Sequence, residues 1–143
     1  MKIKESISIS QSPQKIWDFW LLVTTDIQWR EGFTKAEWTT KPPHGVGSAG
    51  VHYHEKLGPT PWTILKWEDG HFFEFIHMKE SKLKGSVASY IVEPENEGSL
   101  VTLQANIVGP LIIRIIAPLM RGMMAKGLQN DLQKLKEIME KKE

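Results

Sequence analysis

Apolar and polar residues alternate at the start of the chain. Ile3, Ile7 and Ile9 are separated by lysine and serine residues, and only Glu5 breaks the alternation. Side chains on a strand point to opposite faces in turn, so this pattern predicts a strand with one buried face over residues 3–9.

The next segment has the signals of a helix start. Ser12 offers a side-chain oxygen to the first turn, and Pro13 suits the first helical position. Apolar residues then recur at helical spacing, at Ile16, Trp17, Trp20 and Val23. We therefore expect a short amphipathic helix over residues 13–24.

A series of strand-like segments follows. They cover residues 34–40, 49–57, 60–68, 71–79, 82–92 and 101–107, and the turns between them contain glycine, proline or adjacent polar residues. Asp69 and Gly70 form the clearest hairpin signal, because both residues accept the positive φ of a tight turn. This spacing favours antiparallel pairing of neighbouring strands.

The pattern changes to helical beyond Pro118. Apolar residues lie three or four positions apart, at Met120, Met124, Leu128, Leu132, Leu135 and Met139. At about 1.5 Å per residue, a helix over residues 118–141 is long enough to cross a small domain. A meander of strands buries one face only if another element covers it, and this helix is the one predicted element of sufficient length. The sequence therefore predicts an α+β fold in which a curved antiparallel sheet grips a long C-terminal helix.

The composition is that of one globular domain over residues 1–143. Hydrophobic residues make up 41% and charged residues 24%, with 18 lysines and arginines against 17 aspartates and glutamates. This balance lacks the basic field that attracts nucleic acid, so no such partner is expected. Cysteine is absent, which excludes disulfides, thiol catalysis and thiolate metal sites. The first residues lack the apolar stretch of a secretory signal, so we expect a cytoplasmic protein.

One apolar segment, residues 107–120, differs from the rest of the chain. It is interrupted by glycine, proline and arginine, and it is shorter than the ~20 residues needed to cross a bilayer. No stable membrane insertion is expected. Residues 109–120 could form an apolar lid that touches a membrane transiently while a ligand loads, or they could pack beneath the sheet edge, which is slightly favoured.

Several local patterns, taken in chain order, resemble one known superfamily. They are residues 12–19 (SPQKIWDF), Gln28 with Trp29, residues 45–48 (GVGS), and residues 109–118 followed by 132–136 (LQKLK). Together they resemble the START-like or helix-grip superfamily. Within it, the chain is most similar to the bacterial polyketide cyclase/dehydrase and lipid-transport group, which shares its fold with the birch-pollen allergen.

The resemblance implies a fold and a class of ligand. The element order would be β-α-α-β6-α, with about seven strands wrapped around the C-terminal helix and a deep cavity between sheet and helix. Members of the superfamily use this cavity for lipids, sterols, polyketides and other hydrophobic compounds, as carriers, sensors or, less often, enzymes. No cofactor is implied, and we expect a monomer or a homodimer.

Aromatic and flexible apolar side chains are the candidates for lining such a cavity. Core packing is the simpler reading for any single ring in a strand, but together the rings predict an aromatic-lined interior. Methionines adapt to varied apolar partners, and Gly127 inside a helix indicates either a close approach of the sheet or space for a ligand. The predicted ligand pocket comprises Trp38, Tyr53, Trp62, Trp67, Phe73, Phe75, His77, Tyr90, Met120, Met123, Met124 and Gly127.

Two histidines form a pair that could bind a metal. His52 and His54 lie on one face of a predicted strand, an arrangement that can present two imidazoles to one ion. The sequence places no third ligand beside them. We therefore predict no metal, and interpret the pair as histidines at the surface or at the rim of a pocket.

His77 is the candidate catalytic residue if the protein is an enzyme. It shares a strand face with Phe73 and Phe75, where desolvation can tune an imidazole for proton transfer. A buried histidine bonded to a backbone carbonyl is the simpler alternative. The possible charged partners of His77 are Asp26, Glu55 and Glu74, among which no spacing selects.

Three functions are consistent with these patterns. We favour non-catalytic binding of a hydrophobic small molecule by a carrier or sensor. The second is a polyketide cyclase or dehydratase that uses the same cavity and His77. The third is an interaction protein similar to the activator of the Hsp90 ATPase, which has the same fold; the near-zero net charge argues against it.

Overall fold

The computed structural model describes residues 1–109 and 111–141, with side chains except at residues 111–114. The elements are β1 (Lys2–Ile9), α1 (Pro13–Leu21), the 3₁₀ helix η1 (Val23–Gln28), β2 (Phe33–Trp38), β3 (Ala49–His54), β4 (Gly58–Glu68), β5 (Phe72–His77), β6 (Val87–Glu95), β7 (Gly98–Asn106) and α2 (Leu111–Lys141).

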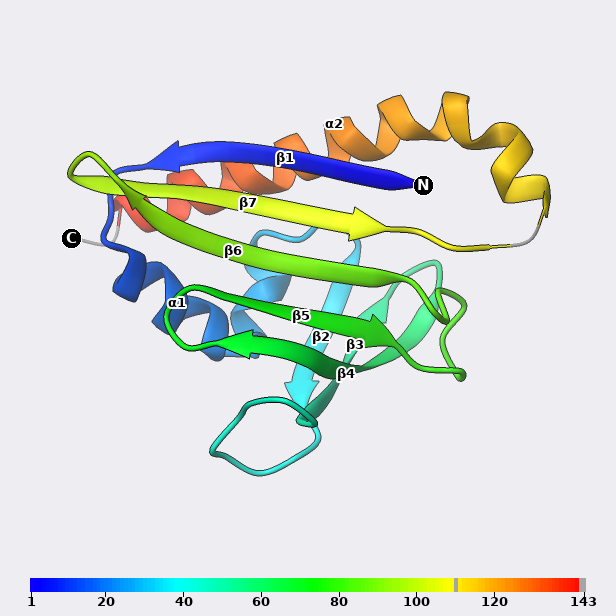
Figure 1. The fold of residues 1–143 in the computed structure, drawn as a ribbon, viewed down its shortest axis with the longest axis horizontal. Helices are drawn as coiled ribbons and strands as arrows, with labels where there is room; N and C mark the ends of the chain where they lie inside the picture. The colour runs from blue at the N-terminus through cyan, green and yellow to red at the C-terminus, as the bar shows by residue number, and fades with distance from the viewer. Residues whose placement is uncertain (110, 142–143) are drawn as a thin grey trace.

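The seven strands form one antiparallel sheet in the order β1-β7-β6-β5-β4-β3-β2. Strands β2 to β7 are a meander in which each strand pairs with the next. Strand β1 pairs with the free edge of β7 and so forms one edge of the sheet. The sheet curls, and α2 runs along β1 and β7 (Figure 1). This arrangement confirms the predicted α+β fold of a curved sheet that grips a C-terminal helix.

Helix α1 begins and ends at side-chain hydrogen bonds. The Ser12 hydroxyl accepts from the backbone N–H of Lys15 at 3.3 Å, which satisfies one free donor of the first turn. At the other end, the Thr25 hydroxyl donates to the backbone carbonyl of Phe19. The helix therefore stops at Leu21, earlier than the predicted residue 24, and the chain continues as η1.

Strand β6 begins later than the sequence pattern predicts. The pattern places residues 82–86 in this strand, but the segment after β5 forms successive turns. Backbone N–H groups of Ser81, Lys84 and Ser86 each donate to the carbonyl three residues earlier. These local bonds occupy groups that a strand would offer to its neighbours, so pairing with β5 starts only at Val87.

The hydrophobic core occupies one half of the concave face. Phe73 meets the indoles of Trp17 and Trp20 edge-on, and Tyr90 meets that of Trp20 in the same way. The centroids of neighbouring rings in this group are 5.0–6.2 Å apart. The last turns of α2 complete this core with Leu132, Leu135 and Met139, all buried. Burial of these large side chains, at about 25 cal/mol per Å² of apolar surface, makes this half the main source of stability.

The first half of α2 differs from the prediction. The sequence pattern starts the helix beyond Pro118, but it starts at Leu111 and contains this proline. Proline removes one helical hydrogen bond and bends a helix, and the first turns of α2 run at an angle to the rest (Figure 1). Ile115 and Leu119 are 69% and 80% exposed, so these side chains do not pack beneath the sheet edge.

Candidate functional site

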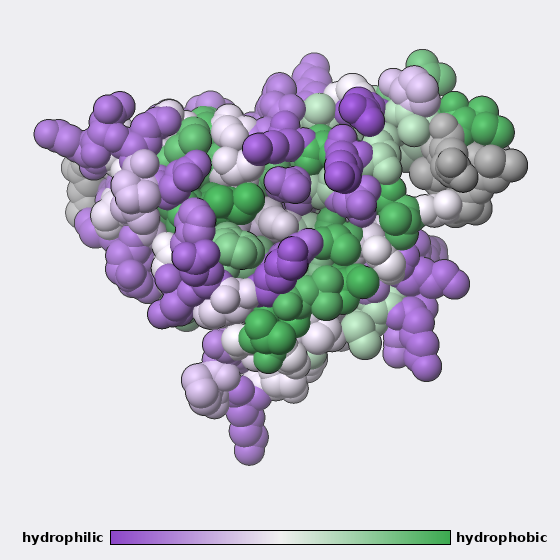
Figure 2. Space-filling view, viewed as in Figure 1, coloured by the Kyte–Doolittle hydropathy of each residue, from purple (hydrophilic) through white to green (hydrophobic). Residues whose placement is uncertain are grey.

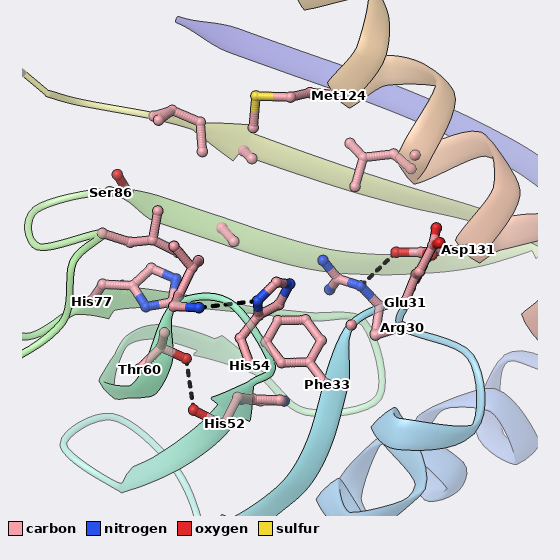
Figure 3. A pocket seen from close by; sticks show the side chains of 18 of the residues that line it. Arg30, Glu31, Phe33, His52, His54, Thr60, His77, Ser86, Met124 and Asp131 are labelled. Atoms are coloured by element: carbon pink, nitrogen blue, oxygen red, sulfur yellow. Dashed lines mark hydrogen bonds and ion pairs between the residues drawn. The ribbon is translucent and has the colours of Figure 1, made fainter. Parts of the chain in front are cut away.

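A cavity of about 400 Å³ lies between the sheet and the middle of α2. Every strand contributes at least one residue to its wall, and α2 contributes Met124, Gly127, Leu128 and Asp131 (Figure 3). The apolar part of the wall consists of Ile3, Phe33, Leu57, Phe75, Leu83, Val87, Ala88, Ala105, Ile107, Met124 and Leu128. Its size falls in the usual range for small-molecule pockets.

Small residues on facing elements leave this space open. Ala88 and Ala105 are paired neighbours on β6 and β7, and both line the cavity. On the opposite wall, a Cβ atom added to Gly127 would meet nothing within 4 Å. Of the two explanations for this helical glycine, the structure therefore supports space beside the helix over a close approach of the sheet.

A chain of buried hydrogen bonds starts behind the cavity wall. The indole Nε1–H of Trp62 donates to His52 Nδ1 at 2.6 Å, and His52 Nε2 lies 2.8 Å from Asp26 Oδ2. The same carboxylate oxygen accepts from the Tyr90 hydroxyl at 3.2 Å. Because an indole N–H can only donate, Nδ1 of His52 must accept the hydrogen bond from Trp62. Nε2 therefore carries the ring hydrogen and donates it in a hydrogen bond to Asp26.

His52 therefore has no free nitrogen for chemistry. Both ring nitrogens are used, and His52 is 5% exposed. Of the two expected positions, at the surface or at the rim of a pocket, the surface is therefore wrong for this residue, which lines the cavity. His54 lies on the cavity wall, and its Nδ1 accepts from the backbone N–H groups of Lys56 and Leu57. Among the described residues, no three histidines or carboxylates converge on a point where a metal could sit.

The chain continues to α2 through an ion pair. Arg30 Nη1 donates to the Tyr90 hydroxyl at 2.7 Å, and Arg30 Nε donates to Asp131 Oδ2 at 2.9 Å. The other oxygen of Asp131 accepts from the backbone N–H of Glu31 at 3.2 Å. Burial disfavours the charge on Arg30, but Tyr90, Asp131 and Asp26 together raise the pKa of this guanidinium above its ordinary value. Arg30 thus stays charged and ties the segment after η1 to the C-terminal helix.

The position of Trp62 in this chain depends on Gly50. The two residues are cross-strand neighbours on β3 and β4, and a Cβ atom at residue 50 would overlap the six-membered ring of the Trp62 indole. The glycine lets the indole lie flat across β3, where its N–H reaches His52.

The structure brings five of the predicted pocket residues together on the cavity wall. They are Phe75, His77, Tyr90, Met124 and Gly127. Neither ring nitrogen of His77 has a hydrogen-bond partner among the described residues, and Nδ1 is buried. Burial lowers the pKa of His77 to about 4, so the ring is neutral near pH 7.

The other seven predicted residues lie elsewhere. Trp62 supports His52 from behind the wall, and Trp67 and Phe73 pack with Trp17 in the core. Trp38 stacks on His44, with centroids 3.7 Å apart. The remaining three, Tyr53, Met120 and Met123, also lie outside the cavity wall. The Tyr53 ring lies under the ammonium group of Lys35, and Met123 is 77% exposed.

Sequence reasoning missed the ion pair that crosses the site. Arg30 and Asp131 are 101 positions apart, and neither stands in a motif. The sequence offers Asp26 only as a possible partner of His77, whereas in the structure it bonds to His52 and Tyr90. A charged residue on the apolar face of the C-terminal helix was the one available signal, because Asp131 lies three positions after Leu128 and four before Leu135.

A curved antiparallel sheet that closes on a long C-terminal helix defines the helix-grip class of α+β folds. A family model described as "Polyketide cyclase / dehydrase and lipid transport" matches residues 1–140. The chain belongs to this family, which agrees with the resemblance found in the sequence. A search of the curated proteins found no relative.

Solved structures share the fold at low sequence identity. TTHA0849 from Thermus thermophilus is 15% identical with a TM-score of 0.75, over 96% of this chain and 95% of that one. The Aha1 dimer from Colwellia psychrerythraea is 18% identical with a TM-score of 0.64, over 96% and 94%. The di-domain ARO/CYC StfQ from the steffimycin biosynthetic pathway is 10% identical with a TM-score of 0.73, over 95% of this chain and 49% of that one. At these identities the similarity shows the fold alone.

None of the helices in the described part of the chain combines the length and apolarity that crossing a membrane requires.

Proposed function

We propose that residues 1–143 act as one unit that binds a hydrophobic small molecule in the cavity, as a carrier or sensor. The observation that carries this proposal is the space of about 400 Å³ between Gly127 and the Ala88–Ala105 pair. Burial of a ligand against this mainly apolar wall would supply the driving force for binding. The family description, which includes lipid transport, supports the same reading.

The polar network beside the cavity supports binding over catalysis. His52, Asp26, Tyr90, Arg30 and Asp131 are bonded to one another, so these groups stabilise the wall and do not present an activated base or nucleophile. Asp26 Oδ1 is buried without a hydrogen-bond partner, but the bonds among these five side chains still hold this part of the wall in a defined shape.

A cyclase or dehydratase is the second candidate, because His77 lies on the cavity wall. A neutral imidazole whose pKa is lowered to about 4 is a weak proton donor at pH 7, and no carboxylate or hydroxyl among the described residues bonds to it. We therefore place non-catalytic binding first. The cytoplasmic location expected from the sequence stays a prediction.

The proposal is tested with an uncharged dye that fluoresces in apolar surroundings, N-phenyl-1-naphthylamine. The purified chain is expected to bind one equivalent with a dissociation constant in the micromolar range, because a pocket of this size buries most of a molecule of that kind. Titration measures the affinity, and native mass spectrometry measures the stoichiometry. Absence of a saturable one-to-one complex would remove the proposed function.

The start of α2 offers a surface through which a ligand could load from a membrane. Ile115, Leu119 and Met123 are spaced four apart, lie on one helical face and are each at least 69% exposed. Apolar residues, drawn in green, are among those at the end of the molecule where α2 begins (Figure 2). Exposed Arg121 and Lys126 on the same helix suit anionic headgroups. We propose transient membrane contact at this face.

Replacing Leu119 and Met123 together by serine is expected to slow transfer of the dye from anionic vesicles several-fold, because the apolar face no longer enters the headgroup layer. The affinity for dye in solution is expected to stay unchanged, since neither side chain lines the cavity. Stopped-flow fluorescence measures both.

The exposed polar pair Gln133 and Lys134, changed to serine, is the control. Equal transfer rates would argue against membrane contact, and a change from dimer to monomer would assign this face to self-association.

A further inference from the structure

The charged groups on the cavity wall are unbalanced. Two cations, Arg30 and Lys56, line the cavity together with three carboxylates, Glu31, Glu55 and Asp131. Glu31, Glu55 and Lys56 are exposed at the rim, so an incoming ligand passes them first. The wall as a whole therefore has an excess of negative charge, which opposes an anionic ligand.

The deeper of the two cations already has partners. Arg30 donates to Asp131 through Nε and to Tyr90 through Nη1, and its guanidinium also lies over the rings of Trp29 and Phe33. A ligand carboxylate that approached the remaining nitrogen, Nη2, would share the guanidinium with the Asp131 carboxylate, and two like charges so close to each other repel.

His77 and His54 are the polar side chains on the wall that have a ring nitrogen without a hydrogen-bond partner among the described residues. Because His54 Nδ1 accepts from the backbone, its Nε2 can only donate, whereas neutral His77 can either donate or accept. Thr60 donates to the backbone carbonyl of His52, and Ser86 is bonded to the backbone of Val108. His77 has no bond from either nitrogen among the described residues, and Nδ1 is the buried one, so Nε2 is the nitrogen that a ligand can reach (Figure 3). A neutral imidazole can donate or accept, which suits an alcohol, a phenol or a ketone.

We propose that the ligand is an uncharged, mainly apolar molecule with one hydroxyl or carbonyl group that bonds to His77, and that the cavity discriminates against carboxylates. This inference rests on the proposed binding function and narrows its ligand class. Free fatty acids and other anionic amphiphiles are thereby excluded as preferred ligands. The unpaired His77 recognises the polar group, and the excess of carboxylates rejects anions.

Four compounds that share one ring system test this inference at pH 7. They are naphthalene, uncharged 2-naphthol, anionic 2-naphthoate and cationic 2-naphthylmethylamine. Each is titrated against the bound N-phenyl-1-naphthylamine. We expect 2-naphthol to displace the dye at concentrations three- to tenfold lower than naphthalene, the gain from one hydrogen bond. We expect 2-naphthoate to be the weakest of the four, and weaker than the cation, because desolvation penalises both ions but the wall repels only the anion.

Two sets of variants separate recognition from general hydrophobicity. His77→Leu is expected to remove the preference for 2-naphthol over naphthalene, and His77→Gln, which keeps an uncharged donor and acceptor, is expected to restore most of it. Glu31→Gln combined with Glu55→Gln removes two rim carboxylates at exposed positions. This double variant is expected to strengthen 2-naphthoate binding several-fold and to leave 2-naphthol unchanged.

The outcomes distinguish this inference from the proposed function. If the dye does not bind, the binding function itself fails, and the inference fails with it. If the dye binds but 2-naphthoate displaces it as well as 2-naphthol does, the inference alone is overturned. A preference for 2-naphthol that survives in His77→Leu would likewise overturn it.

Discussion

Gly127→Phe is expected to abolish binding of N-phenyl-1-naphthylamine, with a loss of affinity of at least about 100-fold. The added ring would project from α2 into the open space beside Gly127, toward Ala88 and Ala105. It would occupy the volume that a ligand needs, and its own burial would stabilise the filled state. Glycine is about 1 kcal/mol less favourable than alanine inside a helix and phenylalanine lies between the two, so the variant is expected to be at least as stable as the parent. Dye titration and urea unfolding measure the two effects.

Gly122→Phe is the matched control for this change. Gly122 lies on the same helix, also has nothing within 4 Å of an added Cβ, and is exposed away from the cavity wall. This variant is expected to gain the same helical stability while it keeps the affinity of the parent. If Gly127→Phe bound the dye as the parent does, the cavity beside Gly127 would not be the binding site.

Asp131→Ala is expected to lower the free energy of unfolding by about 3–5 kcal/mol, because it leaves the charge of Arg30 largely buried without its partner. The same change removes the acceptor for the backbone N–H of Glu31. Both losses separate α2 from the segment that follows η1, on the side of the cavity where Arg30 and Asp131 face each other. Urea unfolding measures the stability, and hydrogen exchange along α2 measures the local loosening.

Glu137→Ala tests whether the effect is specific to the ion pair. Glu137 is an exposed carboxylate on the same helix, with one long hydrogen bond, 3.5 Å, from Gln133. Its removal is expected to change stability little. A double variant in which Arg30 and Asp131 become methionine and leucine should recover most of the loss, since paired apolar groups need no partner. Equal destabilisation by Asp131→Ala and Glu137→Ala would contradict the assigned role of the pair.

The candidate site was predictable where its residues follow a pattern. Phe75, His77 and Tyr90 alternate on neighbouring strands, and Gly127 interrupts a helical series, so periodicity indicated that they face the interior. The same pattern did not distinguish these residues from Phe73 and Trp67, which also face inward but do not line the cavity. Whether an inward-facing residue packs in the core or lines the cavity depends on its position along the strand. The alternation of inward and outward side chains along a strand contains no information about that position.

His52 shows a second limit of sequence patterns. Its position next to His54 suggested a surface or rim pair, yet its two nitrogens are bonded to Trp62 and Asp26 in the interior. Those partners lie on β4 and η1, at sequence distances of 10 and 26 residues. Only the pairing of β3 with β4 and the packing of η1 bring them together, so the local sequence could not indicate the burial of His52.

The sequence by itself determined the kinds and order of the elements, because the spacing of apolar residues and the local chemistry of turns and caps act over a few neighbouring positions. These short-range signals also predicted that the C-terminal helix lies on the sheet, since no other element could cover it. The tertiary structure alone decided which half of the interior is packed and which is hollow. It also decided that Arg30 and Asp131 close one side of that hollow. Such features depend on distances between residues far apart in the chain, and those distances exist only once the sheet has curled around the helix.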